Sequence, residues 1–201
     1  MLPELDTGRL KVRLARPGME APLARFLAEN YAGHLDRWSP PPVQGFFTAT
    51  FWRERLDIAI DELQADRAVR FVLQMRVPQE EGSTPVDAPI IGTCNYTNIV
   101  RGALHACHLG YQIARESQGH GLMAEALRAA NGFMFDAIRM HRLMANFRPE
   151  NARSRALLKR LGFVEEGLAR NYLFIDGAWR DHVLTSLVHP GFDDAWILAP
   201  R

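Results

Sequence analysis

The sequence lacks the features that define several protein classes. It holds only 2 cysteines in 201 residues, Cys94 and Cys107, and they show no Cys-x-x-Cys spacing. A disulfide scaffold is therefore excluded, and we interpret both as small buried hydrophobic residues. No stretch approaches the ~20 apolar residues that a membrane span needs. Neither sign of charge dominates, with 24 Lys plus Arg against 23 Asp plus Glu, which argues against a protein whose main task is to grip nucleic-acid phosphates.

A secretory signal is also missing, because the first six residues carry acids where such a signal carries bases, and no apolar segment follows. We therefore expect a cytoplasmic protein. The 47% of hydrophobic residues, including 11 Phe and 4 Trp, exclude intrinsic disorder. A polar break at 78–88 is too short for a domain linker, and there is no internal repeat. These features predict one domain over 1–201, with its core at about 9–190.

Hydrophobic periodicity predicts the order β-α-α-β-β-β-α-β-α-β-β, a mixed α/β fold. Residues 9–15 alternate strictly, which indicates a half-buried strand with Leu10, Val12 and Leu14 on its buried face. Asp176-Gly177 lies between two strand-like runs and is a strong hairpin signal. The predicted strands are 9–15, 71–77, 89–99, 105–115, 142–147, 169–175 and 180–188; the predicted helices are 19–31, 49–66, 122–138 and 152–161.

The most informative feature is a turn at Gly119 and Gly121, between the end of a strand and the start of a helix. Such a turn directs unpaired N–H groups and the positive end of the helix dipole into one space, which suits an anion such as pyrophosphate. A purely structural turn that needs glycine only for positive φ is the alternative. The P-loop pattern is absent. Ala124 satisfies the Rossmann spacing, but the flanking strands do not fit a dinucleotide fold.

Four separated segments of the chain resemble the GCN5-related N-acetyltransferases (GNAT), and among them the RimJ-type ribosomal-protein alanine N-acetyltransferases. The family signature Gln/Arg-x-x-Gly-x-Gly/Ala reads Gln118-Gly-His-Gly-Leu-Met123, and the methionine that departs from it still offers a backbone N–H. The resemblance covers roughly 9–190 and is carried by 98–111, 118–127, 141–146 and 173–185. It implies a mixed, mostly antiparallel sheet with helices on both faces.

The resemblance also implies the cosubstrate, acetyl-coenzyme A, and the residues that bind it, with no metal. Backbone groups of Tyr111, Gln112 and Ile113 would pair with the pantetheine arm as a further strand does. Asn151 matches a position that contacts the cofactor in these enzymes, and it is also a favoured helix N-cap; the two roles are compatible. The pyrophosphate would be held by the turn that Gln118 opens, through the N–H groups of Gly119, His120, Gly121, Leu122, Met123 and Ala124.

The expected chemistry is acetylation of a protein N-terminal amine. An α-amino group has a pKa near ~7.7–8.0, against ~10.4 for lysine, so it demands less of a general base. The N–H of Ile113 could polarise the thioester carbonyl. Related enzymes place a glutamate base and a tyrosine acid where this chain has Asn146 and Leu158, so that mechanism does not carry over. Ser154 resembles the proposed thiolate partner of the Rim-type enzymes, although a serine early in a helix is also ordinary.

Histidines supply further candidates. His105, Cys107 and His108 do not form a metal site, because on a strand His105 and Cys107 share one face while His108 points to the other. His105 and His182 are possible bases or water relays, or structural residues. Side chains that could border the acceptor groove, or simply pack, are Trp38, Tyr172, Asp181 and His182.

Residues 139–160 hold seven basic residues against the single acid Glu150. This excess is either a solvated helix face or a surface for the coenzyme 3′-phosphate or for ribosomal RNA. The resemblance favours a ribosomal protein as the acceptor. Two alternatives remain: an N-acetyltransferase of a small amine such as an amino acid, polyamine or drug, and a noncatalytic acyl-coenzyme A sensor or ribosome assembly factor.

Overall fold

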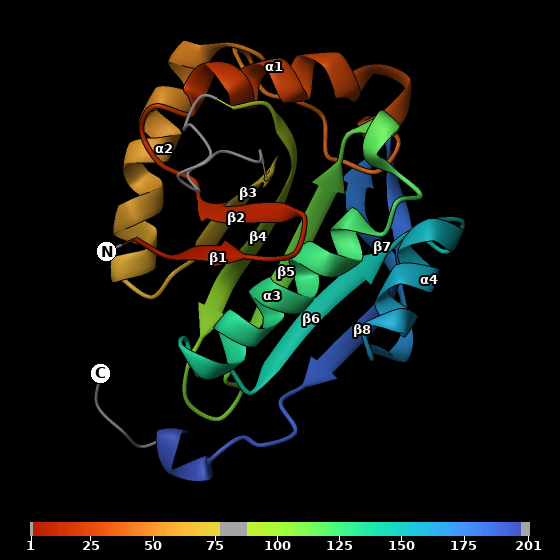
Figure 1. The fold of residues 1–201 in the computed structure, drawn as a ribbon. Helices are drawn as coiled ribbons and strands as arrows, with labels where there is room; N and C mark the ends of the chain where they lie inside the picture. Colours follow the sequence, from red (N-terminus) through yellow and green to blue (C-terminus); the bar gives the residue numbers. More distant parts are fainter. Residues whose placement is uncertain (1, 77–87, 198–201) are drawn as a thin grey trace.

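The computed structural model describes residues 2–76 and 88–197 and contains an eight-stranded sheet in the order β1-β2-β3-β4-β5-β6-β8-β7 (Figure 1). Strands β5 and β6 pair in parallel, and the other neighbours pair antiparallel. The mixed, mostly antiparallel sheet is therefore confirmed. The strands are β1 Glu4–Asp6, β2 Leu10–Leu14, β3 Val69–Met75, β4 Ile90–Val100, β5 Ala106–Ile113, β6 Arg142–Phe147, β7 Val164–Ile175 and β8 Ala178–Val188.

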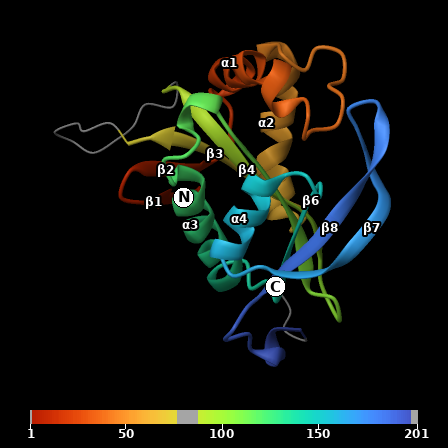
Figure 2. The same ribbon diagram turned by 90° about the vertical axis from the view of Figure 1, so that its right-hand side faces the viewer.

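Helices cover both faces of the sheet, as expected. Figure 2 shows α3 and α4 on one side of it, and α1 and α2 on the other; we call these sides the α3 face and the α1 face. A π-helical turn, η1, continues α1, and Ala32 and Gly33 inside it are not helical. The bounds are α1 Glu20–Asn30, η1 Tyr31–Leu35, α2 Ala49–Gln64, η2 Arg115–Ser117, α3 Leu122–Asp136, α4 Ala152–Arg160 and η3 Asp194–Ile197.

Each face has its own buried core, and strand alternation divides the residues between them. Phe71 and Leu73 of β3 pack with α3, whereas Val72 between them packs with α1 and α2. In β5, the same alternation puts Cys107, Leu109 and Tyr111 on the α3 face. The intervening positions 108, 110 and 112 therefore belong to the α1 face.

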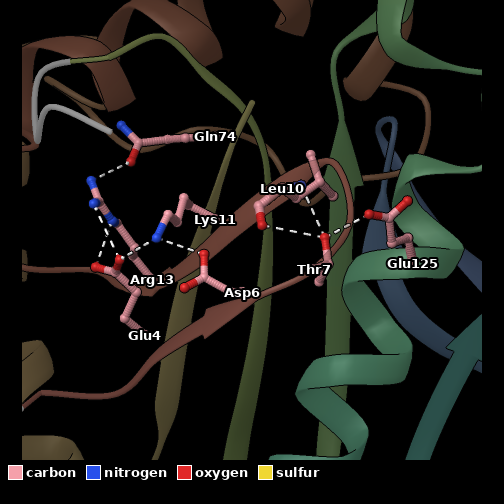
Figure 3. A network of polar contacts seen from close by, with 8 residues as sticks. All are labelled: Glu4, Asp6, Thr7, Leu10, Lys11, Arg13, Gln74 and Glu125. Carbon is pink, nitrogen blue, oxygen red and sulfur yellow. Dashed lines mark hydrogen bonds and ion pairs between the residues drawn. The ribbon is translucent and has the colours of Figure 1, made fainter. Parts of the chain in front are cut away.

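Strand β2 departs from the expectation of a half-buried strand, because all five of its residues are buried. Lys11 and Arg13, which alternation directs away from Leu10, are 5% and 4% exposed. Figure 3 shows how they are accommodated: Lys11 pairs with Asp6 at 2.6 Å, and Glu4 pairs with both Lys11 and Arg13. The two acids come from β1, a strand that the sequence analysis missed, and they neutralise charges that would otherwise be costly to bury.

The last two strands form the hairpin that the sequence predicts. Asp176 and Gly177 both have positive φ, 53° and 70°, as a two-residue hairpin turn of this kind requires. Strand β7 begins at Val164, five residues before the predicted start, and it pairs with β8 through two register shifts.

The predicted polar break at 78–88 lies outside the described residues except for Ala88. In the part of the chain that the structure describes, no helix is long and apolar enough to cross a membrane.

Candidate active site

The sheet opens between β5 and β6. Their parallel pairing is confined to the stretch from Ala106 and Arg142 to His108 and Met144, although β5 continues to Ile113 and β6 to Phe147. Figure 1 shows the two arrows together at one end and separated at the other. The second half of β5 therefore presents a strand edge to an opening, which we call the β5–β6 opening. A strand edge of this kind can bind an extended ligand through backbone hydrogen bonds.

Backbone direction alternates along this edge. The Ala114 N–H donates to Ile91 O at 2.7 Å, toward β4, so the backbone groups of Tyr111 and Ile113 face the β5–β6 opening. By the same alternation, the backbone of Gln112 faces β4. The Ile113 carbonyl lies 2.9 Å from His34 Nε2, which reaches it from η1. Of the three residues expected to bind the pantetheine arm, Tyr111 and Ile113 are thus the two with suitably directed backbones.

The glycine turn lies just beyond the carboxyl end of β5. Gly119 and Gly121 have φ of 82° and 76°, and Gly121 is the N-cap of α3. No side chain caps this helix, whereas Thr48 caps α2 and Asn151 caps α4 through side-chain oxygens. The first N–H groups of α3 therefore lack the usual side-chain acceptor, and they lie at the positive end of the helix dipole. This arrangement fits an anionic ligand such as a pyrophosphate.

A pocket of about 310 Å³ adjoins this turn. Arg153 from α4 contributes a guanidinium and hydrogen-bonds the Gln118 side chain. The sequence analysis missed two of the lining residues, Arg115 and His34. Arg115 follows the strand that leads into the turn, a signal that was available, whereas His34 reaches the pocket only through tertiary packing. The lining residues are His34, Arg115, Gln118, Gly119 and Arg153, so basic groups converge beside the uncapped helix.

Glu125, in the first turn of α3, ties the glycine turn to the N-terminal hairpin. It accepts a hydrogen bond from Thr7 Oγ1 at 2.6 Å (Figure 3). It also accepts hydrogen bonds from the Arg9 N–H at 2.8 Å and from Arg9 Nε at 2.7 Å. Arg9 also donates to the His120 carbonyl at 3.0 Å. Burial acts to raise the pKa of Glu125, but the Thr7 and Arg9 hydrogen bonds outweigh it and hold the pKa below its ordinary value. The carboxylate therefore stays ionised and braces the turn.

Replacing Glu125 with alanine should weaken coenzyme binding indirectly, because Glu125 acts through Thr7 and Arg9 and not through the ligand. The brace consists of charge-assisted hydrogen bonds, so its loss should raise the coenzyme A Kd about tenfold. Isothermal titration measures this value. Glu62→Ala is the matched control, because Glu62 of α2 makes a comparable ion pair with Arg70 of β3. Equal Kd values in the two variants would contradict the bracing role.

Ser154 and Tyr111 meet at the side of the β5–β6 opening. The Tyr111 hydroxyl and Ser154 Oγ hydrogen-bond to each other, from β5 and α4 respectively. Burial raises the pKa of Tyr111 to about 12, although the hydrogen bond with Ser154 opposes this effect. The phenol therefore keeps its proton at neutral pH. The pair was not expected from the sequence, which identified Ser154 alone; the position of the family's tyrosine acid, Leu158, is 1% exposed in the core.

Asn151 caps α4, as one of its two expected roles requires. Its side-chain oxygen accepts the Ser154 N–H at 3.1 Å, which fixes the helix turn that carries Ser154. The contact with the coenzyme stays a prediction.

Asn151→Ala should lower the free energy of unfolding by about 1 kcal/mol, the usual cost of a lost N-cap. Thr48→Ala removes the corresponding cap of α2 and should cost a similar amount. We expect only Asn151→Ala to raise the coenzyme A Kd as well. Urea unfolding and titration of both variants make the comparison, and an unchanged Kd in Asn151→Ala would leave capping as the sole role of this residue.

The structure does not place His105 near the β5–β6 opening. His105 precedes β5 at the end where β5 and β6 are paired, and the eight residues to Ile113 span about 26 Å at ~3.3 Å per residue. Its Nε2 lies 2.9 Å from the Arg139 carbonyl and 3.0 Å from Arg101 Nη1, and its ring contacts Phe192. Of the two roles expected of His105, base or relay and structural residue, these contacts at the far end of the strand favour the structural one.

The predicted border residues of the acceptor groove divide into two groups on the α1 face. Tyr172 OH accepts a hydrogen bond from Asn146 Nδ2 at 3.1 Å, and its ring lies 5.5 Å from that of His182. The Trp38 ring is in contact with two guanidinium groups, those of Arg37 at 5.3 Å and Arg148 at 5.4 Å from its centroid. Arg148 also donates to the Arg37 carbonyl at 2.6 Å and so joins the segment after η1 to the end of β6.

Asp181 does not join these groups. One of its carboxylate oxygens accepts the Asn171 N–H at 2.9 Å and stabilises the irregular part of β7. The remaining candidate cluster, Cys107 and His108, divides between the two faces as strand alternation requires: Cys107 is fully buried in the α3-face core, and burial raises its pKa to about 12. Among residues 2–76 and 88–197, no group of three or more His, Cys, Asp or Glu side chains could hold a metal ion.

The basic residues of 139–160 do not form one surface. Arg142, Arg148 and Arg155 pair with Glu166, Glu150 and Glu165. Arg139 lies over the Trp196 ring. Lys159 and Arg160 occupy the last turn of α4, where cations complement the helix dipole. Of the seven, Arg153 is the residue that lines the pocket beside the glycine turn.

Comparison with known proteins gives concordant results. Residues 9–164 match the family model of the acetyltransferase (GNAT) domain. The chain is 43% identical over 186 residues to the [ribosomal protein uS5]-alanine N-acetyltransferase of Escherichia coli, and the match covers 92% of this chain and 91% of the relative.

Two solved structures are similar over nearly the whole chain. The ribosomal-protein-S5-alanine acetyltransferase of Vibrio fischeri is 35% identical with a TM-score of 0.85, and the match covers 95% of this chain and 99% of the other. Mycobacterium smegmatis RimJ, solved in complex with CoA-disulfide, is 30% identical with a TM-score of 0.79, covering 95% of this chain and 90% of the other. The second of these proteins holds CoA-disulfide on a fold of the same kind.

Proposed function

Because this chain belongs to the acetyltransferase (GNAT) family, we propose that it transfers the acetyl group of acetyl-coenzyme A to the N-terminal α-amine of a ribosomal protein that begins with alanine. The observation that carries the proposal is the β5–β6 opening, which leads directly to the uncapped N-terminus of α3. The acceptor follows from the 43% identical relative, a ribosomal-protein alanine N-acetyltransferase. We further propose that residues 1–201 act as a single acetyltransferase domain.

The coenzyme would be held at three places. The backbone groups of Tyr111 and Ile113 face the opening and would bind the pantetheine arm, with Gln112 between them anchoring β5 to β4. The turn from Gln118 to Ala124 would hold the pyrophosphate through N–H groups that no side chain caps. Arg115 and Arg153 border the adjacent pocket and supply positive charge. When bound, acetyl-coenzyme A supplies an activated acetyl thioester.

Transfer of the acetyl group forms an N–C bond, breaks a C–S bond and moves one proton from nitrogen to sulfur. A backbone N–H that faces the opening, that of Tyr111 or Ile113, would polarise the carbonyl as an oxyanion-type donor. Ser154 would donate its proton to the departing sulfur and be reprotonated by Tyr111, since the two hydroxyls are hydrogen-bonded and the Tyr111 phenol is protonated at neutral pH. The proton released from the amine nitrogen would return to Tyr111 through solvent, which restores both hydroxyls and completes the transfer from nitrogen to sulfur. The pair would supply the proton that the missing tyrosine acid supplies in related enzymes.

An α-amine suits a site that lacks a strong base. Asn146 stands where related enzymes carry a glutamate, and an amide takes no proton. About a tenth of an α-amine is uncharged at pH 7, against less than a thousandth of a lysine side chain, from pKa values near ~8 and ~10.4. The site therefore favours protein N-termini over lysine side chains. A ribosomal substrate would place the reaction in the cytoplasm, and the exposed arginines near the site could then contact ribosomal RNA.

Thiol release from acetyl-coenzyme A tests the proposal. A peptide with the alanine N-terminus of a ribosomal protein should be acetylated, while its N-formylated form and a lysine-containing, N-blocked peptide should not react. Mass spectrometry should find the acetyl group on the α-nitrogen. Turnover of polyamines or amino acids with no reaction of peptides would instead show a small-amine enzyme. Coenzyme binding without turnover of any amine would show a noncatalytic sensor.

A further inference from the structure

Four buried polar atoms on one side of the sheet have no hydrogen-bond partner among the described residues. They are Thr93 Oγ1, His108 Nδ1, Asn146 Oδ1 and Arg148 Nε. A buried polar atom without a partner destabilises the fold, so a fold that keeps several of them together indicates a place where a polar ligand binds.

Register shows that the four share the α1 face. Thr93 pairs with Gln112 across β4 and β5, and His108 pairs with Met144 across β5 and β6. Directly paired residues point to the same face, and so do residues two apart on one strand. Asn146 follows Met144 by two residues, and Arg148 follows Asn146 by two. All four positions therefore belong to the face on which Trp38 and Tyr172 lie.

Open space lies among them, at Gly110. Gly110 and Asn146 are each two residues beyond the last pair, His108 and Met144, where β5 and β6 begin to separate. A Cβ built at Gly110 would meet no atom within 4 Å, and Gly110 is exposed. An acceptor molecule can therefore approach the closed end of the β5–β6 opening from the α1 face, while α3 and the coenzyme turn lie toward the opposite face.

Asn146 Oδ1 is a hydrogen-bond acceptor, and His108 Nδ1 is one in the tautomer that carries its proton on Nε2. Asn146 Nδ2 donates to Tyr172 OH, which assigns the side-chain amide its orientation and leaves Oδ1 as the unpartnered acceptor. Burial lowers the pKa of His108. Its ring is therefore neutral at neutral pH and carries one nitrogen lone pair.

We propose that His108 Nδ1 and Asn146 Oδ1 form the binding site for the acceptor α-amine, each accepting one N–H. A neutral primary amine has two N–H donors and one lone pair. If the two acceptors engage both N–H groups, the lone pair is left to point into the β5–β6 opening. Tyr172 is a positioning residue, since it holds the Asn146 amide. This inference rests on the proposed acetyltransferase function and assigns residues to its acceptor side.

Binding of unreactive peptides tests the assignment apart from turnover. With coenzyme A bound, the wild-type protein should bind an alanine-starting peptide about tenfold more tightly than its N-formylated form, since two hydrogen bonds depend on the free amine. His108→Ala and Asn146→Ala should lose this discrimination and bind both peptides equally. Ser186→Ala is the control, because Ser186 lies on the same face of β8 but already has Glu166 as a partner. It should discriminate as the wild type does.

Steady-state rates add a second readout. Both alanine variants should raise the peptide KM while leaving the acetyl-coenzyme A KM unchanged. Asn146→Asp keeps the shape of the side chain and an acceptor oxygen, so it should retain tight peptide binding. If both alanine variants still bound the free peptide about tenfold more tightly than its N-formylated form, the assignment would be overturned. If the wild type binds coenzyme A but transfers acetyl to no amine, the proposed function fails instead.

Discussion

Gly121→Val should abolish measurable coenzyme binding. Gly121 has a φ of 76° and is the N-cap of α3, a conformation that a β-branched residue rarely adopts. Its Cβ would lie 3.7 Å from an Arg9 nitrogen, an ordinary contact, so the damage comes from backbone strain and not from a clash. A backbone change that relieved this strain would turn the first N–H groups of α3 away from the position proposed for the pyrophosphate. Losing two or more charge-assisted hydrogen bonds raises the Kd by at least about 100-fold.

A matched control separates this effect from instability. Gly102 has nearly the same φ, 71°, and an added Cβ there would meet nothing within 4 Å. It lies in the turn between β4 and β5, at the end of the sheet opposite the glycine turn of α3. Gly102→Val should therefore lower thermal stability by a similar amount and leave the coenzyme Kd unchanged. Retained coenzyme affinity in Gly121→Val would remove the pyrophosphate assignment.

Ser154→Ala should lower kcat by about 100-fold, the lower end of what a general acid contributes. The coenzyme Kd should change little, because the Asn151 cap holds the backbone of this turn without the Ser154 hydroxyl. Steady-state rates with the peptide substrate measure kcat, and titration with coenzyme A measures its Kd. Unchanged turnover would exclude Ser154 as the thiolate partner.

Tyr111→Phe distinguishes the relay from a simple donor. If Tyr111 reprotonates Ser154, its loss should lower kcat while the Tyr111 backbone continues to face the coenzyme. A rate equal to that of the wild type would leave Ser154 as the whole proton path. In that case the Tyr111 and Ser154 hydrogen bond would serve to position Ser154.

The sequence predicts local structure here far better than it predicts strand pairing. Strand β6 has the predicted bounds, because alternation and a preceding helix define it. Strand β1 was missed because three residues carry too little pattern. The first part of β7 was missed because Glu165, Glu166 and Gly167 show no strand preference, and their place in the strand depends on pairing with β8.

The site shows the same division. The glycine turn could be found from the sequence because local chemistry defines it. The β5–β6 opening could not, since it depends on where two strands separated by residues 114–141 stop pairing. His34 reaches Ile113 only through tertiary packing. The pattern that predicts a strand at 105–115 does not show which end of that strand lies near the opening.

The most direct test is a structure of the protein with coenzyme A bound. The account predicts that the pantetheine arm lies in the β5–β6 opening against the backbones of Tyr111 and Ile113, with the pyrophosphate at the turn from Gln118 to Ala124. The sulfur should lie within about 3.5 Å of Ser154 Oγ, near the outer limit for a hydrogen bond. A pantetheine arm bound elsewhere, or a sulfur that neither Ser154 nor Tyr111 can reach, would contradict the account.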